Sequence, residues 1–264
     1  MNQTFSFHRF GLVLKLHLSE HLKSYLLGMG VLLGIWMVLL LPSVENINAF
    51  GESVYRSHSF MFGFLFCGTG AWFASEAFKV VSTPLRGIPH LMLPASRLEK
   101  FLVALLLLLV FIPVFLGIFY AVEGLCFSLI NAKLPASSPK YELLNPLGRY
   151  MDSFMRNLMF ITPSFFLLGS IYFPKLPFVK TGVIAFTLLL FTTIYLNSFI
   201  IRQLFPARDR YGSTLFQEVS FTEDGRTYFV ELQGTPQLII NGILLLMIPS
   251  LWFISYVRFK EKQL

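Results

Sequence analysis

The chain has 264 residues and a net charge of +7, and 55% of its residues are hydrophobic whereas only 13% are charged. Soluble globular domains carry about 25% charged residues, and a single core of this size could not hide such an apolar excess. The composition excludes a disordered chain, a disulfide scaffold and an ordinary cytosolic enzyme, and it indicates a polytopic membrane protein. The basic residues flank long apolar runs, so they indicate membrane orientation rather than nucleic-acid binding.

Six stretches lack Asp, Glu, Lys and Arg and are long enough to cross about 30 Å of hydrocarbon. They predict an all-α membrane protein with spans over residues 24–44, 57–75, 101–122, 157–174, 181–201 and 238–257. The fourth is short and contains Pro163, and every later segment would change sides if it did not span. The first is long enough to span and lacks a small-residue cleavage site after it, which predicts a retained anchor.

The distribution of Lys and Arg predicts the orientation of these spans. One side of the membrane carries 12 of the 21 basic residues, and its segments are shorter in total than those of the other side. It holds residues 1–23, 76–100, 175–180 and 258–264. Both termini are therefore expected in the cytoplasm. The main outer loops are then residues 123–156 and 202–237.

Residues 1–23 are predicted to form an amphipathic helix that lies on the cytoplasmic leaflet. Phe7, Phe10 and Leu14 belong to an apolar set at helical spacing, and Lys15 falls on another side of the helix. The alternative is a cytoplasmic extension of the first span, which is also helical and differs only in its angle.

Residues 76–100 are predicted to be the largest cytoplasmic loop. Pro84, Pro89 and Pro94 exclude a long regular helix before residue 95. The sequence Ser-Arg-Leu-Glu from Ser96 to Glu99 matches a capping box, in which each of these two side chains bonds the other residue's backbone N–H. A helix is therefore expected to start near Ser96 and to run into the third span.

The same loop has the character of a docking surface. Its apolar stretch contains Ile88 and Leu91 and follows Pro84, the first proline of the loop. Arg86 and Arg97 flank this stretch. The alternative is a loop that folds back on its own helices.

Two further patterns concern the outer side and the packing of helices. An Asp-Gly pair at 224–225 separates alternating β-formers at 218–221 and 227–231, which predicts a small extracytoplasmic β-hairpin rather than an irregular loop. Gly30 and Gly34 form a GxxxG pair, and such small residues let helix backbones approach closely within a chain or in a dimer.

The spans have almost no ionisable residues, and His58 near one end is the nearest exception. Ion-coupled transport usually needs such groups inside the membrane. The chain also lacks a phosphate-binding Gly-x-x-x-x-Gly-Lys-Ser/Thr loop, a His-Glu-x-x-His zinc motif and a Gly-x-Ser-x-Gly elbow. We therefore expect a non-enzymatic chain that binds no metal or cofactor and is driven by another polypeptide docked on residues 5–22 and 80–98.

The order of these elements resembles the permease subunit of a type-2 (ABC-2) ABC exporter. The segments Leu91–Phe101 and Trp252–Gln263 resemble phrases in small permease-like proteins of Bacteroidetes-type bacteria. The outer hairpin departs from the short helical elements that this family often has between its last two spans.

The resemblance implies a bacterial inner-membrane complex of two permease protomers, identical or different, with two ATPase subunits that carry ATP and Mg. It implies a coupling helix, around residues 82–97, seated in a groove of the ATPase. The expected ATPase contacts are then Pro84, Arg86, Ile88, Leu91 and Arg97, with Phe7, Phe10, Leu14 and Lys15 on an N-terminal interface helix. The alternative function is a non-transporting membrane anchor or sensor subunit, and a secondary transporter is more distant.

Overall fold

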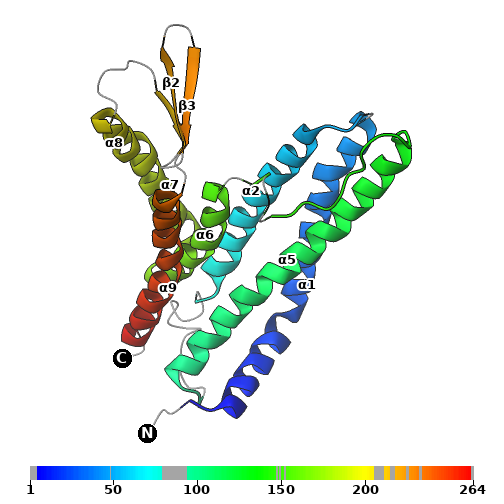
Figure 1. Ribbon diagram of the computed structural model, residues 1–264. Coiled ribbons are helices and arrows are strands. Elements are labelled where there is room, and N and C mark those ends of the chain that lie inside the picture. Colours follow the sequence, from blue (N-terminus) through cyan, green and yellow to red (C-terminus); the bar gives the residue numbers. More distant parts are fainter. Residues whose placement is uncertain are drawn as a thin grey trace.

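The protein is described by a computed structural model that covers residues 5–47, 49–78, 94–146, 148, 150–151, 153–204, 211–214, 218–223, 226–231 and 234–262. The chain is mostly helical, and its two termini lie at the same end of the helical bundle (Figure 1). We call this the basal end, and it also holds the start of the helix that follows residue 96. The opposite end, which holds residues 134–151, is the distal end.

The helical segments follow the predicted spans in chain order. They are α1 (Phe7–Asn46), α2 (Glu52–Glu76), α5 (Arg97–Lys133), α6 (Ser153–Tyr172), α7 (Pro177–Leu190), the π-helical η1 (Phe191–Leu196), α8 (Asn197–Leu204) and α9 (Thr235–Lys262). Each predicted span overlaps a helix, and the segment at 181–201 is shared by α7, η1 and α8.

Five helical segments within the described residues are long and apolar enough to cross a membrane, so the protein is a multi-pass membrane protein. They are Phe7–Glu45, Arg97–Lys133, Phe154–Tyr172, Pro177–Ile200 and Gln237–Lys262. Helix α2, which contains the predicted span 57–75, has the length but is not among the five. It buries residues from Tyr55 to Ser75 along its length, so much of its surface meets other helices rather than lipid.

The predicted N-terminal amphipathic helix and the first span form one continuous helix, α1, of 40 residues. The prediction of a separate helix over residues 1–23 is therefore corrected in favour of the alternative, a helical extension of the first span. The physical reason is that the sequence offers no helix breaker before Pro42. At 1.5 Å per residue, α1 is about 60 Å long, roughly twice the hydrocarbon thickness.

Helix α5 also extends beyond its predicted span, which was expected to end at residue 122. It continues to Lys133, so the non-helical outer segment begins at Leu134. Glu123 had marked the expected end of the span, but its side chain is fully buried inside the helical bundle. Helices α1 and α5 run side by side as a long pair (Figure 1).

A small antiparallel sheet follows α8 in the chain. Strand β2 (Glu218–Glu223) pairs with β3 (Arg226–Glu231), with Glu218 opposite Glu231, and the turn at 224–225 lies outside the described residues. A third strand that was not predicted, β1 (Tyr211–Thr214), pairs with β2 on its other edge. The placement of this sheet outside the membrane stays a prediction.

Small residues on α2 allow α6 to approach it closely. A Cβ added at Gly63 would lie 2.7 Å from Cγ of Met155, and one added at Gly70 would lie 3.0 Å from Cγ of Pro163. The two helices pack along their lengths, and α6 in turn contacts α7 and α9. The bundle therefore has α1 and α5 on one side of α2 and the remaining membrane helices on the other (Figure 1).

Aromatic side chains fill the interior between α1, α2 and α5. Trp36, Phe62, Phe66, Phe115 and Phe119 are almost fully buried. Their ring centroids lie 4.7–5.9 Å apart, in mostly edge-to-face or tilted pairs, which aromatic rings favour. Part of the large Phe content thus packs helices against one another and is not exposed to lipid.

Candidate functional site at the basal end

The predicted capping box at the start of α5 is confirmed. The backbone N–H of Glu99 donates to Oγ of Ser96 at 3.1 Å, and the N–H of Ser96 donates to Oε2 of Glu99 at 2.8 Å. This reciprocal pair satisfies two backbone donors that a helix start would otherwise leave without partners. It fixes the point at which the predicted coupling loop becomes α5.

The other carboxylate oxygen of Glu99 binds the start of α1. Its Oε1 accepts the backbone N–H of Ser6 at 2.7 Å and an Nη2–H of Arg9 at 3.1 Å. The Glu99 side chain is fully buried, whereas that of Arg9 is 38% exposed. We call Ser6, Arg9, Ser96 and Glu99 the Glu99 junction.

Electrostatics favour a negative charge at this junction. Glu99 lies in the first turn of α5 and contacts the start of α1. Each helix therefore presents the positive end of its dipole to the Glu99 carboxylate. The guanidinium of Arg9 adds a formal positive charge. The carboxylate is therefore stabilised by three sources at once, although it is removed from water, and it ties together two helices whose starts are 90 residues apart.

An aromatic cluster anchors the other end of the predicted coupling loop. Phe78, just after α2, stacks on Phe101 of α5 with centroids 5.7 Å apart and lies 4.9 Å from Phe259 of α9. The ring centroid of Tyr256 in α9 lies 5.4 Å from that of Phe101. The three phenylalanines are at most 5% exposed. Residues 77–78 are therefore packed against both α5 and α9.

Polar contacts link the end of α9 to α6 at the same end of the bundle. Nε of Arg258 donates to the hydroxyl of Tyr172 at 2.5 Å, and its guanidinium lies 5.1 Å from the centre of that ring. The ammonium of Lys262 donates to the carbonyl of Ile171. Four helices (α1, α2, α5 and α9) thus meet at the two ends of the predicted coupling loop, and α6 is attached to them through both α2 and α9.

The predicted ATPase contacts can be placed only in part. Pro84, Arg86, Ile88 and Leu91 lie outside the described residues. Arg97 is the first residue of α5 and is partly buried next to the Glu99 junction.

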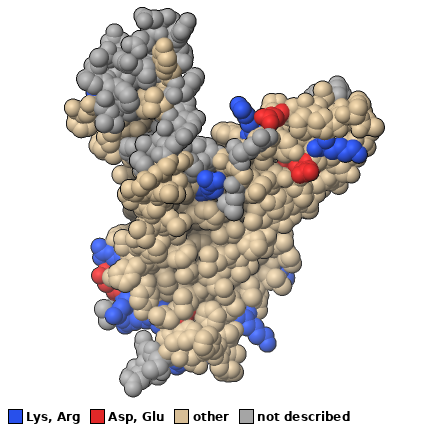
Figure 2. Space-filling model, in the orientation of Figure 1, with Lys and Arg blue, Asp and Glu red and all other residues tan. Residues whose placement is uncertain are grey.

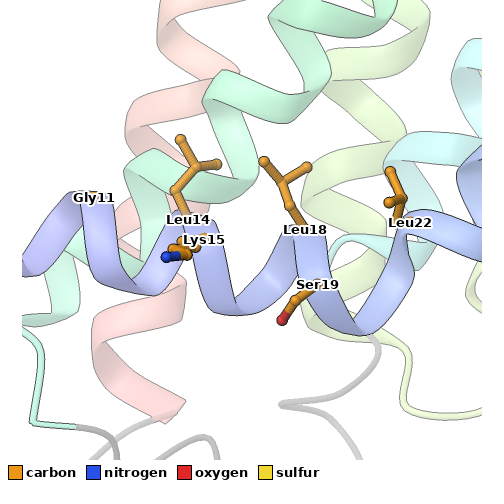
Figure 3. A pocket seen from close by; sticks show the side chains of 6 residues that line it. All are labelled: Gly11, Leu14, Lys15, Leu18, Ser19 and Leu22. Atoms are coloured by element: carbon orange, nitrogen blue, oxygen red, sulfur yellow. The ribbon is translucent and has the colours of Figure 1, made fainter.

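The predicted N-terminal interface residues lie together in the first turns of α1. Phe7 is 83% exposed, and the ring of Phe5 lies within 6.1 Å of both Phe7 and Phe10. Leu14 and Lys15 line a shallow open groove, together with Gly11, Leu18, Ser19 and Leu22. Leu14, Leu18 and Leu22 point the same way from the helix, while Lys15 and Ser19 point elsewhere (Figure 3).

The predicted packing pair, Gly30 and Gly34, faces open space in the single chain. A Cβ added at either residue would meet no atom within 4 Å. Exposed apolar side chains surround them on the same face of α1, among them Leu27, Val31 and Val38. This face is therefore free of contacts with the rest of the protomer.

Charged side chains gather toward the two ends of the molecule on the face in Figure 2, and a broad uncharged region lies between them. This is the pattern expected of a protein whose middle faces hydrocarbon.

Sequence reasoning missed two features of this structure. It identified Glu99 only as a local cap, since Ser6 and Arg9 are distant in sequence. It also treated Glu123 as a boundary marker, although its carboxylate pairs with His58 of α2. The weak signal for that pair was a histidine at the start of one predicted span and an acid at the end of the next.

The described residues include no group of three or more His, Cys, Asp or Glu side chains placed to hold a metal ion. The chain matches no protein-family model, no curated protein and no solved structure.

Proposed function

We propose that this protein is the membrane-spanning permease subunit of an ATP-driven ABC exporter, in which a separate ATPase subunit supplies the energy. The observation that carries the proposal is the anchoring of both ends of the predicted coupling loop. Its first residues are held by the aromatic cluster of Phe78, Phe101 and Phe259, and its last by the Glu99 junction. A force applied to residues 79–93 would reach α1, α2, α5 and α9 directly.

The mechanism that we propose is a population shift. ATP binding closes the partner ATPase, which then prefers one arrangement of the coupling loop and biases the bundle toward one access state. The ATPase would contact Pro84, Arg86, Ile88, Leu91 and Arg97, and the first turns of α1 would add a second contact through Phe7, Phe10, Leu14 and Lys15. ATP and Mg would bind to the ATPase and not to this chain.

The proposed topology has six spans, namely the five long apolar helical segments and α2. The membrane would be a bacterial inner membrane, with both termini in the cytoplasm. The small residues of α2 fit a span that packs closely against other helices, and its exposed Phe60, Phe64 and Trp72 would face lipid. The basal end, rich in helix starts and ends, would then face the ATPase.

The test of the proposal is purification of the tagged chain from its native membrane, a search for a co-purifying ATPase subunit, and measurement of ATP hydrolysis in the complex. We expect Leu91→Asp to abolish the association, because a charge would enter an apolar contact. The matched control is Leu129→Asp, a partly exposed leucine near the distal end of α5, which should leave the association intact. If no ATPase associates with the native chain, a membrane anchor or sensor becomes the better proposal.

We further propose that a second permease protomer packs on the face of α1 that holds Gly30 and Gly34. Substituting Gly34 with leucine should weaken dimerisation about tenfold, because the side chain keeps the two backbones apart. Gly28→Leu is the control, since Gly28 is equally free of contacts but lies on the opposite face of α1. Dimer fractions in detergent, measured by light scattering, would contradict the proposal if the two variants behaved alike.

A further inference from the structure

A buried contact between a histidine ring and a glutamate side chain joins α2 to α5 toward the distal end of the bundle. Nδ1 of His58 lies 3.1 Å from Oε1 of Glu123, and the two side chains are 3% and 0% exposed. The imidazole also stacks on the ring of Phe127, one turn further along α5, with centroids 5.1 Å apart and planes within 2° of parallel. The pair and the stack together fix the position of α2 relative to α5.

The same carboxylate holds a segment of the outer loop. Residues Tyr141–Leu144, here called the strap, are non-helical and lie against the distal parts of α2 and α5. The backbone N–H of Leu144 donates to Oε2 of Glu123 at 2.9 Å. One oxygen of Glu123 therefore binds α2 and the other binds the strap.

Two more side chains, one from α2 and one from α5, form hydrogen bonds with the backbone of the strap. The hydroxyl of Tyr55 in α2 donates to the carbonyl of Glu142 at 3.1 Å and accepts its N–H at 2.8 Å. The side-chain amide of Asn131 in α5 accepts the N–H of Tyr141 at 2.8 Å and donates to its carbonyl at 2.9 Å. The strap thus bridges α2 and α5 through consecutive residues.

These contacts depend on one another. A buried carboxylate that loses one of its partners keeps its desolvation cost without compensation, so partial separation is strongly unfavourable. Moving α2 away would leave Glu123 without His58, and moving the strap away would leave it without the Leu144 N–H. The buried side chains of Tyr141 and Leu144, which are 4% and 1% exposed, also hold the strap, and the Tyr141 hydroxyl accepts the N–H of Gly51 at 2.8 Å. Because Glu123 contacts both His58 of α2 and the N–H of Leu144, the position of the strap also depends on α2.

We propose that the strap and the His58–Glu123 pair form a lock that holds the distal ends of α2 and α5 together and opens as a single unit. Helices α2 and α5 are also the two that flank the predicted coupling loop. The use of the lock in transport therefore rests on the proposed function, but the existence of the lock does not, and its test needs no ATPase.

The test is the rate of trypsin cleavage between Lys140 and Tyr141 in the purified full-length protein in detergent micelles. Lys140 is exposed, but Tyr141 is buried and its backbone N–H and C=O are both bound by the side-chain amide of Asn131. Cleavage therefore requires the strap to detach from α2 and α5. We expect Glu123→Gln to raise this rate at least about tenfold, because cleavage follows the population of the open form. The control Glu45→Gln removes an exposed carboxylate at the same end and should change the rate less than about twofold.

Two further variants keep the test decisive. His58→Gln should also raise cleavage, and its combination with Glu123→Gln should raise it by less than the product of the two single effects. Circular dichroism establishes that each variant is folded. If Glu123→Gln does not fold, Tyr55→Phe, which removes only one hydroxyl, should raise cleavage about threefold. The lock is overturned if Glu123→Gln is folded and is cleaved at the native rate. It is also overturned if the effects of His58→Gln and Glu123→Gln on the cleavage rate simply multiply. If Glu123→Gln does not fold, an unchanged cleavage rate for Tyr55→Phe overturns it.

Discussion

Replacing Gly169 with alanine should disrupt the packing of α6 against α7. A Cβ at this position would lie 1.9 Å from Oγ1, 2.6 Å from Cγ2 and 2.7 Å from Cβ of Thr181. The Cβ of Thr181 cannot swing away without moving the backbone of α7, so the helices must separate. We expect a loss of about 3 kcal/mol or more in the free energy of unfolding, at the upper end of the cost of overpacking.

The thermal midpoint of the purified protein in detergent measures this loss. Gly117→Ala makes the same chemical change inside α5, where an added Cβ meets no atom within 4 Å. That control should be neutral or stabilising, because alanine favours the helix. Adding Thr181→Ala to Gly169→Ala should recover part of the loss, since it removes two of the three clashes. Equal midpoints for Gly169→Ala and Gly117→Ala would contradict this account of the helix contact.

Replacing Glu99 with alanine should release the start of α1 from α5. The change leaves the backbone N–H groups of Ser6 and Ser96 without the Glu99 carboxylate as acceptor and removes one partner of Arg9. Each orphaned buried donor costs about 1–3 kcal/mol, while the bond from the backbone N–H of residue 99 to Oγ of Ser96 is kept. We expect a destabilisation of about 3 kcal/mol, together with faster trypsin cleavage after Arg9.

The matched control for this change is Glu261→Ala. Glu261 also accepts from an arginine, Arg258, at 2.6 Å, but both side chains are about half exposed. Exposed ion pairs contribute about 0–1 kcal/mol, so this variant should stay close to the native midpoint. The proposed role of the junction fails if Glu99→Ala is no less stable than Glu261→Ala and its N-terminus is cleaved no faster.

The sequence predicted those parts of the fold that depend on local pattern. Apolar runs between charges placed each span on a helix or on a series of consecutive helices, and the spacing of Ser96 and Glu99 predicted the start of α5. Alternating β-formers at 218–221 and 227–231 correspond to β2 and β3. These features depend on residues that are near one another in the chain, so a single sequence contains the information.

The errors arose where partners are distant in sequence. Glu123 was taken to end the third span because a charge is costly in hydrocarbon, but His58, 65 residues earlier, compensates it and α5 continues for ten residues. Glu99 looked like an ordinary cap until Ser6 and Arg9 were placed on its second oxygen. A local pattern shows that a charge is present and cannot show which distant group neutralises it.

The two buried carboxylates lie on the same helix. Glu99 begins α5 at the basal end, Glu123 holds the lock toward the distal end, and about 36 Å of helix separates them at 1.5 Å per residue. Between them lies Pro113, the one residue of α5 without a backbone N–H. A proline in a helix removes a hydrogen bond and allows the axis to bend. Pro113 is therefore the position at which the axis of α5 bends most easily, and a displacement of Glu99 would have to pass this position to reach Glu123.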